Sequence, residues 1–248
     1  MAHNSSVIIS VASGKGGVGK TCIAINLAAS LSEKGKRILL VDCDLGLANV
    51  DIMLGINPRA NLKDVIFGDM DVRYVLTKTG AGFDFLPASS GVKEMAQLLH
   101  ENIEKLKEII RQVSEAYDYV LCDVGAGISD MVLQFNLFAA RNLVVVSKDL
   151  TSITDAYAMM KTMRRSFGRS SFEIIVNSTR DEIEGEKVFN HLDSICKKFL
   201  EFSPRYLGSI PYDEAIPRSI MKQTALIRLF PGSQAATKIS DIANAICL

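Results

Sequence analysis

The chain has 248 residues, 48% of them hydrophobic, which is enough to bury a sizeable core, and we expect one α/β domain over residues 1–248. Its 28 Lys and Arg residues balance its 28 Asp and Glu residues, which argues against DNA as the main partner, because non-specific nucleic-acid binding depends on a basic surface. The sequence shows no membrane-spanning apolar run and no N-terminal signal segment, and we therefore expect a cytoplasmic protein.

Short runs of β-branched and aliphatic residues alternate with longer helical patterns along the chain. We predict strands over 7–12, 37–41, 83–86, 119–122, 143–147, 173–176 and 206–210. We predict helices over 22–33, 95–116, 154–167, 182–202 and 213–222. This alternation indicates a mostly parallel sheet with helices on both faces. In such folds the ligand lies beyond the carboxyl ends of the strands.

The segment 14–21 reads Gly-Lys-Gly-Gly-Val-Gly-Lys-Thr and lies between the first predicted strand and the first predicted helix. This is the pattern of a phosphate loop, whose glycines let backbone N–H groups curl around a phosphate chain. Lys20 can then reach the β- and γ-phosphates of ATP, and the Thr21 hydroxyl can bind Mg²⁺. We expect the nucleotide contacts of this segment to come from Gly14, Gly16, Gly17, Val18, Gly19, Lys20, Thr21 and Cys22.

The same glycines also match the dinucleotide-binding pattern G-x-G-x-x-G, and Asp42 follows at the expected distance. A dehydrogenase is therefore the formal alternative. However, a dinucleotide-binding loop has no use for the consecutive residues Lys20 and Thr21 at its pyrophosphate, whereas a phosphate loop requires both. The sequence therefore favours a nucleoside triphosphate.

Carboxylates follow two of the predicted strands. Asp42 and Asp44 stand one residue apart at the end of one strand, so they point in different directions and can serve different tasks. Alternatively, both cap the following turn. Asp123 ends the apolar run 119–122, as the acidic residue of a Walker B segment does, and such a group holds Mg²⁺ through a water. The glycines of the next segment, 124–127, allow a switch loop to swing near the γ-phosphate.

The five cysteines form no C-x-x-C pair and lie mostly in apolar runs, so we interpret them as reduced core residues: Cys22, Cys43, Cys122, Cys196 and Cys247. The three histidines are scattered, so no imidazole metal site is visible. This pattern argues against a cluster-carrying protein.

Two further surfaces have competing interpretations. Lys161, Arg164 and Arg165 share one helical face, with Arg169 just beyond it, and this face is either simply solvated or a docking surface for an acidic partner, lipid or DNA. The segment 235–246 carries an apolar stripe with one basic residue nearby. Lipid-binding helices are usually rich in Lys and Arg, so we expect this helix to pack on the core, and it gives no support for a peripheral membrane contact.

The second lysine of the loop, Lys15, is not needed by an ordinary phosphate loop. The pattern Lys-Gly-Gly-Val-Gly-Lys-Thr over 15–21 resembles the deviant Walker A box of the MinD/ParA family of ATPases. The resemblance implies an ATP-dependent homodimer in which Lys15 reaches the ATP of the partner. It also implies that Asp44 orients the attacking water beside Mg²⁺ and that Asn49 helps to hold the nucleotide state.

The resemblance places adenine recognition at the ends of the last two predicted strands. Asn177 can both donate to and accept from the base edge, and the loop at Pro211, Tyr212 and Asp213 follows the last strand. Guanine binders usually carry Asn-Lys-x-Asp in this region. The segment 177–180 reads Asn-Ser-Thr-Arg, so ATP is preferred over GTP.

Within the family, the segments 44–51, 87–91 and 210–213 resemble those of the flagellar-number regulators, the FlhG (FleN) group. This resemblance implies a regulatory ATPase acting with a partner protein in flagellar placement and number. The alternatives are a positioning ATPase for a chromosome, plasmid or division site, and a nucleotide-gated assembly scaffold. The absence of paired cysteines argues against the scaffold.

Overall fold

The computed structural model describes residues 6–45, 48–88 and 100–247. Within these ranges the strands form one eight-stranded sheet in the order β3-β4-β2-β5-β1-β6-β7-β8. All neighbouring strands are parallel except β3 and β4, which pair antiparallel at one edge. The strands are β1 (Val7–Ser13), β2 (Ile38–Cys43), β3 (Thr77–Lys78), β4 (Asp84–Leu86), β5 (Tyr119–Ala126), β6 (Arg141–Ser147), β7 (Glu173–Thr179) and β8 (Arg205–Pro211).

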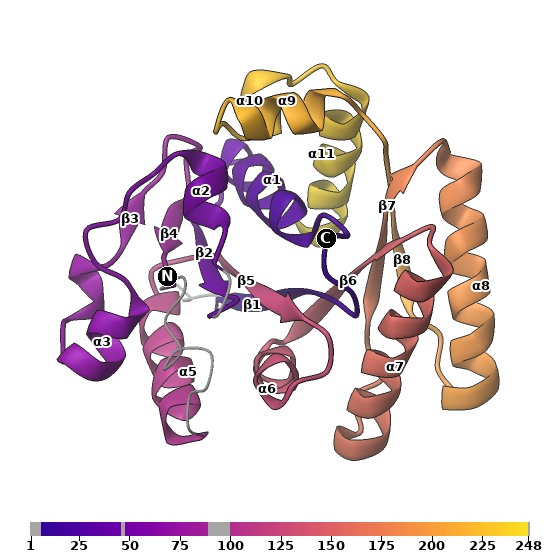
Figure 1. Cartoon of the computed structure of the whole chain (residues 1–248), viewed down its shortest axis with the longest axis horizontal. Helices are drawn as coiled ribbons and strands as arrows, with labels where there is room; N and C mark the ends of the chain where they lie inside the picture. The colour runs from indigo at the N-terminus through magenta and orange to yellow at the C-terminus, as the bar shows by residue number, and fades with distance from the viewer. Residues whose placement is uncertain (1–5, 46–47, 89–99, 248) are drawn as a thin grey trace.

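Helices cover both faces of the sheet (Figure 1). One face packs against α1, α10 and α11, and the other against α3 and α5 to α8. The helices are α1 (Lys20–Glu33), α2 (Val50–Leu54), α3 (Leu62–Gly68), α5 (His100–Ser114), α6 (Asp130–Phe138), α7 (Leu150–Phe167), α8 (Glu182–Leu200), α9 (Ala215–Met221), α10 (Leu226–Leu229) and α11 (Gln234–Cys247), with a 3₁₀ turn, η1, at Val72–Tyr74. The predicted α/β class with a mostly parallel sheet is confirmed.

The central strands feed two separate cores because their side chains alternate between the faces. In β2, Leu39 and Val41 belong to the core beneath α5 and α6, whereas Ile38 and Leu40 belong to the core beneath α1 and α11. All four side chains are at most 2% exposed. A strand covered on both faces must be apolar at every position, and this is why these strands appear in the sequence as continuous apolar runs.

Each of the predicted strands lies within one residue of an observed strand or inside a longer one. Six observed features were not predicted: the two-residue strand β3, the 3₁₀ turn η1 and the helices α2, α3, α6 and α10. They are short, so hydrophobic periodicity has too few residues in which to show. The predicted helix over 95–116 is observed from His100 to Ser114, and residues 95–99 lie outside the described residues.

The C-terminal helix α11 packs on the core, as the sequence predicted. The residues of its apolar stripe are at most 2% exposed: Ala235, Ile239, Ile242, Ala243 and Ile246. They join the core that α1 covers. The basic residue of the segment, Lys238, pairs with Glu182 of α8 at 3.0 Å rather than with solvent alone. None of the helices in the described ranges is long and apolar enough to cross a membrane.

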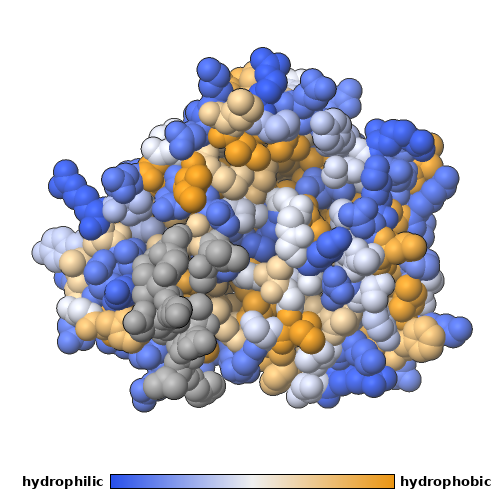
Figure 2. All heavy atoms as spheres, in the orientation of Figure 1, coloured by the Kyte–Doolittle hydropathy of each residue, from blue (hydrophilic) through white to orange (hydrophobic). Residues whose placement is uncertain are grey.

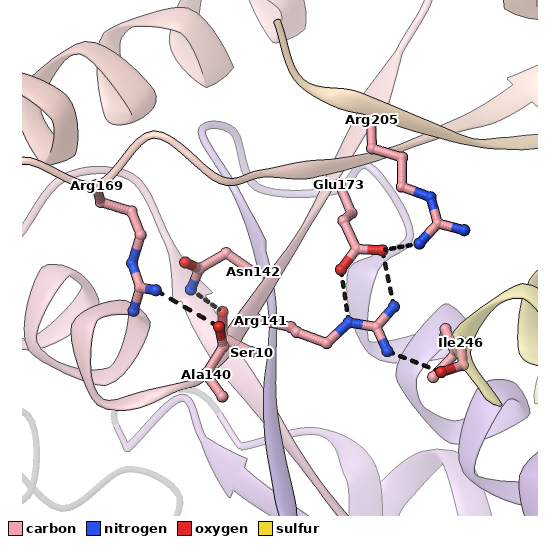
Figure 3. Close-up of polar contacts among 8 residues, drawn as sticks. All are labelled: Ser10, Ala140, Arg141, Asn142, Arg169, Glu173, Arg205 and Ile246. Atoms are coloured by element: carbon pink, nitrogen blue, oxygen red, sulfur yellow. Dashed lines mark hydrogen bonds and ion pairs between the residues drawn. The ribbon is translucent and has the colours of Figure 1, made fainter. Parts of the chain in front are cut away.

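Polar contacts at the amino ends of the strands fix the C-terminal helix to the sheet (Figure 3). Arg141 of β6 donates two hydrogen bonds to the Glu173 carboxylate of β7, at 2.7 and 2.8 Å. Its third bond, 2.8 Å long, goes to the carbonyl of Ile246. Arg205 of β8 contacts the same carboxylate at 3.7 Å. This network lies at the opposite end of the strands from the phosphate loop.

The predicted basic face of α7 is only partly free for a partner. Arg169 donates to the carbonyl of Ala140 (Figure 3). It also donates to the carbonyls of Leu137 and Ala139 at the end of α6. It therefore caps a neighbouring helix. Lys161 and Arg164 are half-buried, whereas Arg165 is exposed.

Candidate nucleotide-binding site

The phosphate loop connects the carboxyl end of β1 to the first residue of α1. Gly19 precedes the helix with a left-handed backbone, at φ 91°. A Cβ atom at this position would lie 2.3 Å from the side-chain amide nitrogen of Asn177. Only glycine satisfies both constraints, because it alone adopts positive φ freely and leaves room for the neighbouring amide.

The loop is held from three sides. The Ser13 hydroxyl donates to the carbonyl of Lys15 at 2.9 Å. The Asn177 amide donates to the carbonyl of Val18 at 2.7 Å. Gly14 packs so closely on α7 that an added Cβ would lie 2.1 Å from the backbone of Asp155. Contacts within the chain therefore fix the shape of the loop.

A pocket of about 430 Å³ lies on one side of this loop. It contains the predicted residues Gly16, Gly17, Gly19, Lys20, Thr21, Cys22, Asp44 and Asn49. A second pocket of about 270 Å³ lies on the other side and is lined by Lys15, Val18 and Asn177, among others. A larger hollow of about 660 Å³ between α3, η1 and α5 contains none of the phosphate-loop residues, so its size does not make it the candidate site.

Lys20, which lines the 430 Å³ pocket, forms a buried ion pair with Asp123. The Lys20 amine lies 2.9 Å from a carboxylate oxygen of Asp123. The two residues are 8% and 1% exposed, so neither charge has much water to solvate it. Each charge therefore depends on the other, because an unpaired charge at such depth is strongly unfavourable.

Asp42 organises the segment that follows β2. One of its carboxylate oxygens accepts the N–H of Asp44 at 3.0 Å, and the other accepts those of Asn49 and Val50 at 3.2 and 3.5 Å. Burial, and next the charge of Asp123, raise the pKa of Asp42 to about 8. The turn-capping interpretation thus applies to Asp42. Asp44 is half-buried and lines the pocket.

Lys15 contacts the first turn of α7 in its own chain. Its amine donates to the Thr151 hydroxyl at 2.8 Å, and the contact is exposed. No pattern in the sequence singled out Thr151, because the contact joins residues that are far apart in the chain. The neighbouring Leu150 is 74% exposed, which leaves a large apolar side chain beside Lys15 on the same surface.

The residues predicted to bind adenine are divided by the structure. Asn177 lies against the phosphate loop, as described above. Pro211, Tyr212 and Asp213 line neither of the two pockets beside the loop. The Asp213 carboxylate accepts the N–H groups of Ala215 and Ala235 at 2.9 and 3.1 Å, and so caps α9 and α11. Tyr212 is 67% exposed. A base contact by this loop stays a prediction.

Several pocket residues were not predicted. Four line the 430 Å³ pocket without belonging to a motif: Ser13, Ile52, Met53 and Ile220. Ile52 and Met53 of α2 and Ile220 of α9 form an apolar wall of this pocket. Burial raises the pKa of the neighbouring Cys22 thiol to about 11, so this thiol is neutral at physiological pH. Cys43, Cys122 and Cys196 are also buried and free, and Cys247 is half-buried.

The sequence matches the family model described as AAA domain over residues 6–169. It is 38% identical over 239 residues to the antiactivator FleN of Pseudomonas aeruginosa, covering 96% of this chain and 85% of that protein. It is 28% identical to the flagellum site-determining protein YlxH of Helicobacter pylori, covering 95% of this chain and 80% of the relative.

Solved structures agree with this assignment. The cell division ATPase MinD of Pyrococcus furiosus superposes with a TM-score of 0.82 at 25% identity, covering 97% of this chain and 98% of that one. MinD from the MinC:MinD complex of Aquifex aeolicus gives a TM-score of 0.81 at 27% identity, covering 98% and 96%. On the sequence match, the fold and the phosphate loop together, the chain belongs to the MinD/ParA-type AAA-domain ATPases and is a relative of FleN (FlhG).

Proposed function

We propose that this ATPase is a nucleotide-dependent switch that dimerises around ATP and regulates flagellar number or placement. The observation that carries the proposal is the phosphate loop with two lysines in different surroundings. Lys20 is buried beneath the loop, whereas Lys15 lies on its exposed side. The 38% identity to FleN over 96% of the chain supports the flagellar role.

The pocket has the donors that ATP and Mg²⁺ require. The backbone N–H groups of the loop and the α1 N-terminus suit the phosphate chain, and Lys20 supplies a charge next to it. The Thr21 hydroxyl and the Asp44 and Asp123 carboxylates would hold Mg²⁺, directly or through water, because this cation prefers hard oxygen ligands. When bound, Mg²⁺ neutralises charge on the phosphates. No group of three or more His, Cys, Asp and Glu side chains suited to a metal occurs among the described residues, in keeping with a cation that keeps waters and phosphate ligands.

Hydrolysis is assigned to Asp44, which would hold and polarise the attacking water. Phosphoryl transfer requires mainly positioning and charge stabilisation, so one placed carboxylate is sufficient for this step. Lys20 would leave Asp123 and contact the β- and γ-phosphates. Asn49, from the same segment as Asp44, would report whether the γ-phosphate is present.

The face around the loop suits a second copy of the chain. Ile52, Ile128 and Leu150 are 60%, 54% and 74% exposed, and all three stand next to residues of the site. Exposed apolar side chains grouped around a charged pocket are typical of protein interfaces. Lys15 would leave Thr151 and reach the ATP of the partner. The zero net charge leaves DNA the less favoured partner.

Two experiments test the ATP-dependent dimer and the flagellar role separately. Light scattering with ATP, ADP and no nucleotide should show a dimer only with ATP, and phosphate release should show slow turnover. Deletion of the gene, followed by complementation with the parent or with Asp44→Ala, should change the number or position of flagella seen by electron microscopy. Normal flagella together with misplaced septa or plasmids would instead favour the positioning-ATPase alternative.

A further inference from the structure

Gln223, which lies outside every motif, adopts a backbone conformation that its side chain disfavours. It follows α9 with φ 49°, in the left-handed region where a glycine is usual after a helix. Its N–H donates to the carbonyl of Ile220 at 2.9 Å, and the next N–H, of Thr224, donates to Ser219 at 3.1 Å. The backbone would close the helix equally well with glycine, so the Gln223 side chain needs another explanation.

That side chain crosses to α2. Its amide nitrogen donates to the carbonyl of Ile52 at 3.1 Å. It also packs on Gly55, which ends α2 with φ 63°. A Cβ atom on Gly55 would lie 2.9 Å from both the Cβ and the Oε1 of Gln223. Gln223 and Ile52 are 171 residues apart in the sequence, so this hydrogen bond is a tertiary contact between the ends of two short helices.

Both sides of the contact belong to the wall of the nucleotide pocket. Ile52 and Met53 of α2 and Ile220 of α9 line it. Figure 2 shows apolar atoms gathered over α2 and beneath α9 and α10, so the wall is an apolar patch at the rim of the pocket. In this wall the bond from Gln223 to Ile52 joins the end of α9 to α2.

The helix that follows Gln223, α10, is held in place by buried contacts. In α10, Leu226 and Ile227 are at most 5% exposed. The N–H of Ile227 donates to the Asn26 side chain of α1 at 3.2 Å, and that side chain is 2% exposed. Gln223 is therefore fixed relative to the helix that begins at the phosphate loop.

The other end of α2 is fixed by Asp42, which accepts the N–H groups of Asn49 and Val50. The segment carrying Asp44 and Asn49 thus runs into a helix of five residues held at both ends. A helix this short has little stability of its own and takes its position from such contacts. We propose that Gln223 is a positioning residue for ATP hydrolysis, which holds α2 and through it sets Asp44 and Asn49 against the phosphate pocket. The proposal rests on the assignment of hydrolysis to this pocket.

Gln223→Gly separates positioning from plain stability. It removes the disfavoured backbone conformation, so the melting temperature should stay the same or rise. It also removes the bond to α2, so kcat should fall about 3- to 10-fold, as expected for one lost hydrogen bond, while ATP affinity changes less than about 2-fold. A purely structural residue would give the stability effect without the loss of kcat.

Three further variants sharpen the test. Glu201→Gly is the matched control, since Glu201 ends α8 with the same backbone conformation, φ 59°, and it should leave kcat unchanged. Gln223→Glu keeps the length of the side chain but presents an oxygen to the Ile52 carbonyl, so it should lower kcat at least as much as glycine does. Gly55→Ala should also lower kcat, and adding it to Gln223→Gly should cost less than the two effects multiplied together.

Each outcome has one meaning. A parent protein that binds ATP without hydrolysing it would overturn the assignment of hydrolysis to this pocket. A parent that hydrolyses ATP, with Gln223→Gly turning over at the parent rate, would overturn the role of Gln223 alone. Reduced kcat in Gln223→Gly and Gln223→Glu with parent-like Glu201→Gly would support it.

Discussion

Replacing Lys20 by methionine should destabilise the nucleotide-free protein, in addition to weakening ATP binding. Methionine keeps the length of the side chain but removes its charge, which leaves Asp123, 1% exposed, without the partner at 2.9 Å. Removing one member of a buried pair typically costs about 3 to 5 kcal/mol. The neighbouring Asp42 gives no relief, because it accepts hydrogen bonds already and supplies no positive charge.

Proton uptake sets an upper limit on this cost. An aspartate in water titrates near pH 3.9, so placing a proton on one carboxylate at pH 7 costs about 4 kcal/mol, and at pH 5 about 1.5 kcal/mol. The stability deficit of Lys20→Met should therefore be about 4 kcal/mol at pH 7 and shrink as the pH falls. For a chain of this size, about 4 kcal/mol corresponds to a fall of about 8 to 16 °C in melting temperature.

The assay is thermal or urea unfolding of parent and variant without nucleotide, at pH 7 and pH 5. The double variant Lys20→Met/Asp123→Asn removes both charges and should recover most of the lost stability, although it should still fail to bind ATP in calorimetry. A deficit below about 1 kcal/mol at pH 7, or one that does not depend on pH, would refute the reasoning, since both values follow from the stranded carboxylate.

Three other changes have definite expected outcomes. Lys15→Ala should bind ATP as a monomer but lose the ATP-dependent dimer in light scattering, and a variant that dimerises like the parent would return Lys15 to the role of a loop residue. Asp44→Ala should lower turnover by about 10²- to 10⁴-fold and lengthen the lifetime of the ATP dimer, both measured on one preparation; turnover at the parent rate would move the water-holding role elsewhere. Ile242→Ala should cost about 2 to 5 kcal/mol in urea unfolding, because Ile242 is 2% exposed and packs on β8, and a cost near zero would contradict the core position of α11.

The sequence predicted those parts of the protein that have a strong local pattern, such as an apolar run or a motif with a specific spacing. Fully buried strands such as β6 appear as continuous apolar runs, and the loop 14–19 has a spacing that few other structures share. The phosphate loop, the Asp44 segment and Asp123 could therefore be predicted from the sequence, and the structure brings Lys20 and Asp123 to 2.9 Å.

What the sequence could not predict depends on contacts between distant residues. Thr151 beside Lys15 and Gln223 beside Ile52 lie 136 and 171 residues from their partners. Nothing local in either segment requires such a partner. Asp213 is a further example, because its carboxylate caps two helices, and that capping depends on where α11 starts.

Several charged side chains at the site have partners within the chain. Lys20 is paired with Asp123, Lys15 with Thr151, and the carboxylate of Asp42 with backbone N–H groups. On the proposed mechanism, Lys20 and Lys15 exchange their contacts for phosphate contacts when ATP binds, and each lost contact lowers the apparent affinity for ATP. The same contacts re-form when the γ-phosphate leaves, so they favour return to the starting state. A ligand shifts such an equilibrium only by its differential affinity for the two states. On the proposed mechanism the γ-phosphate supplies that difference, because Lys20 and Lys15 would each leave a partner within the chain to reach a phosphate.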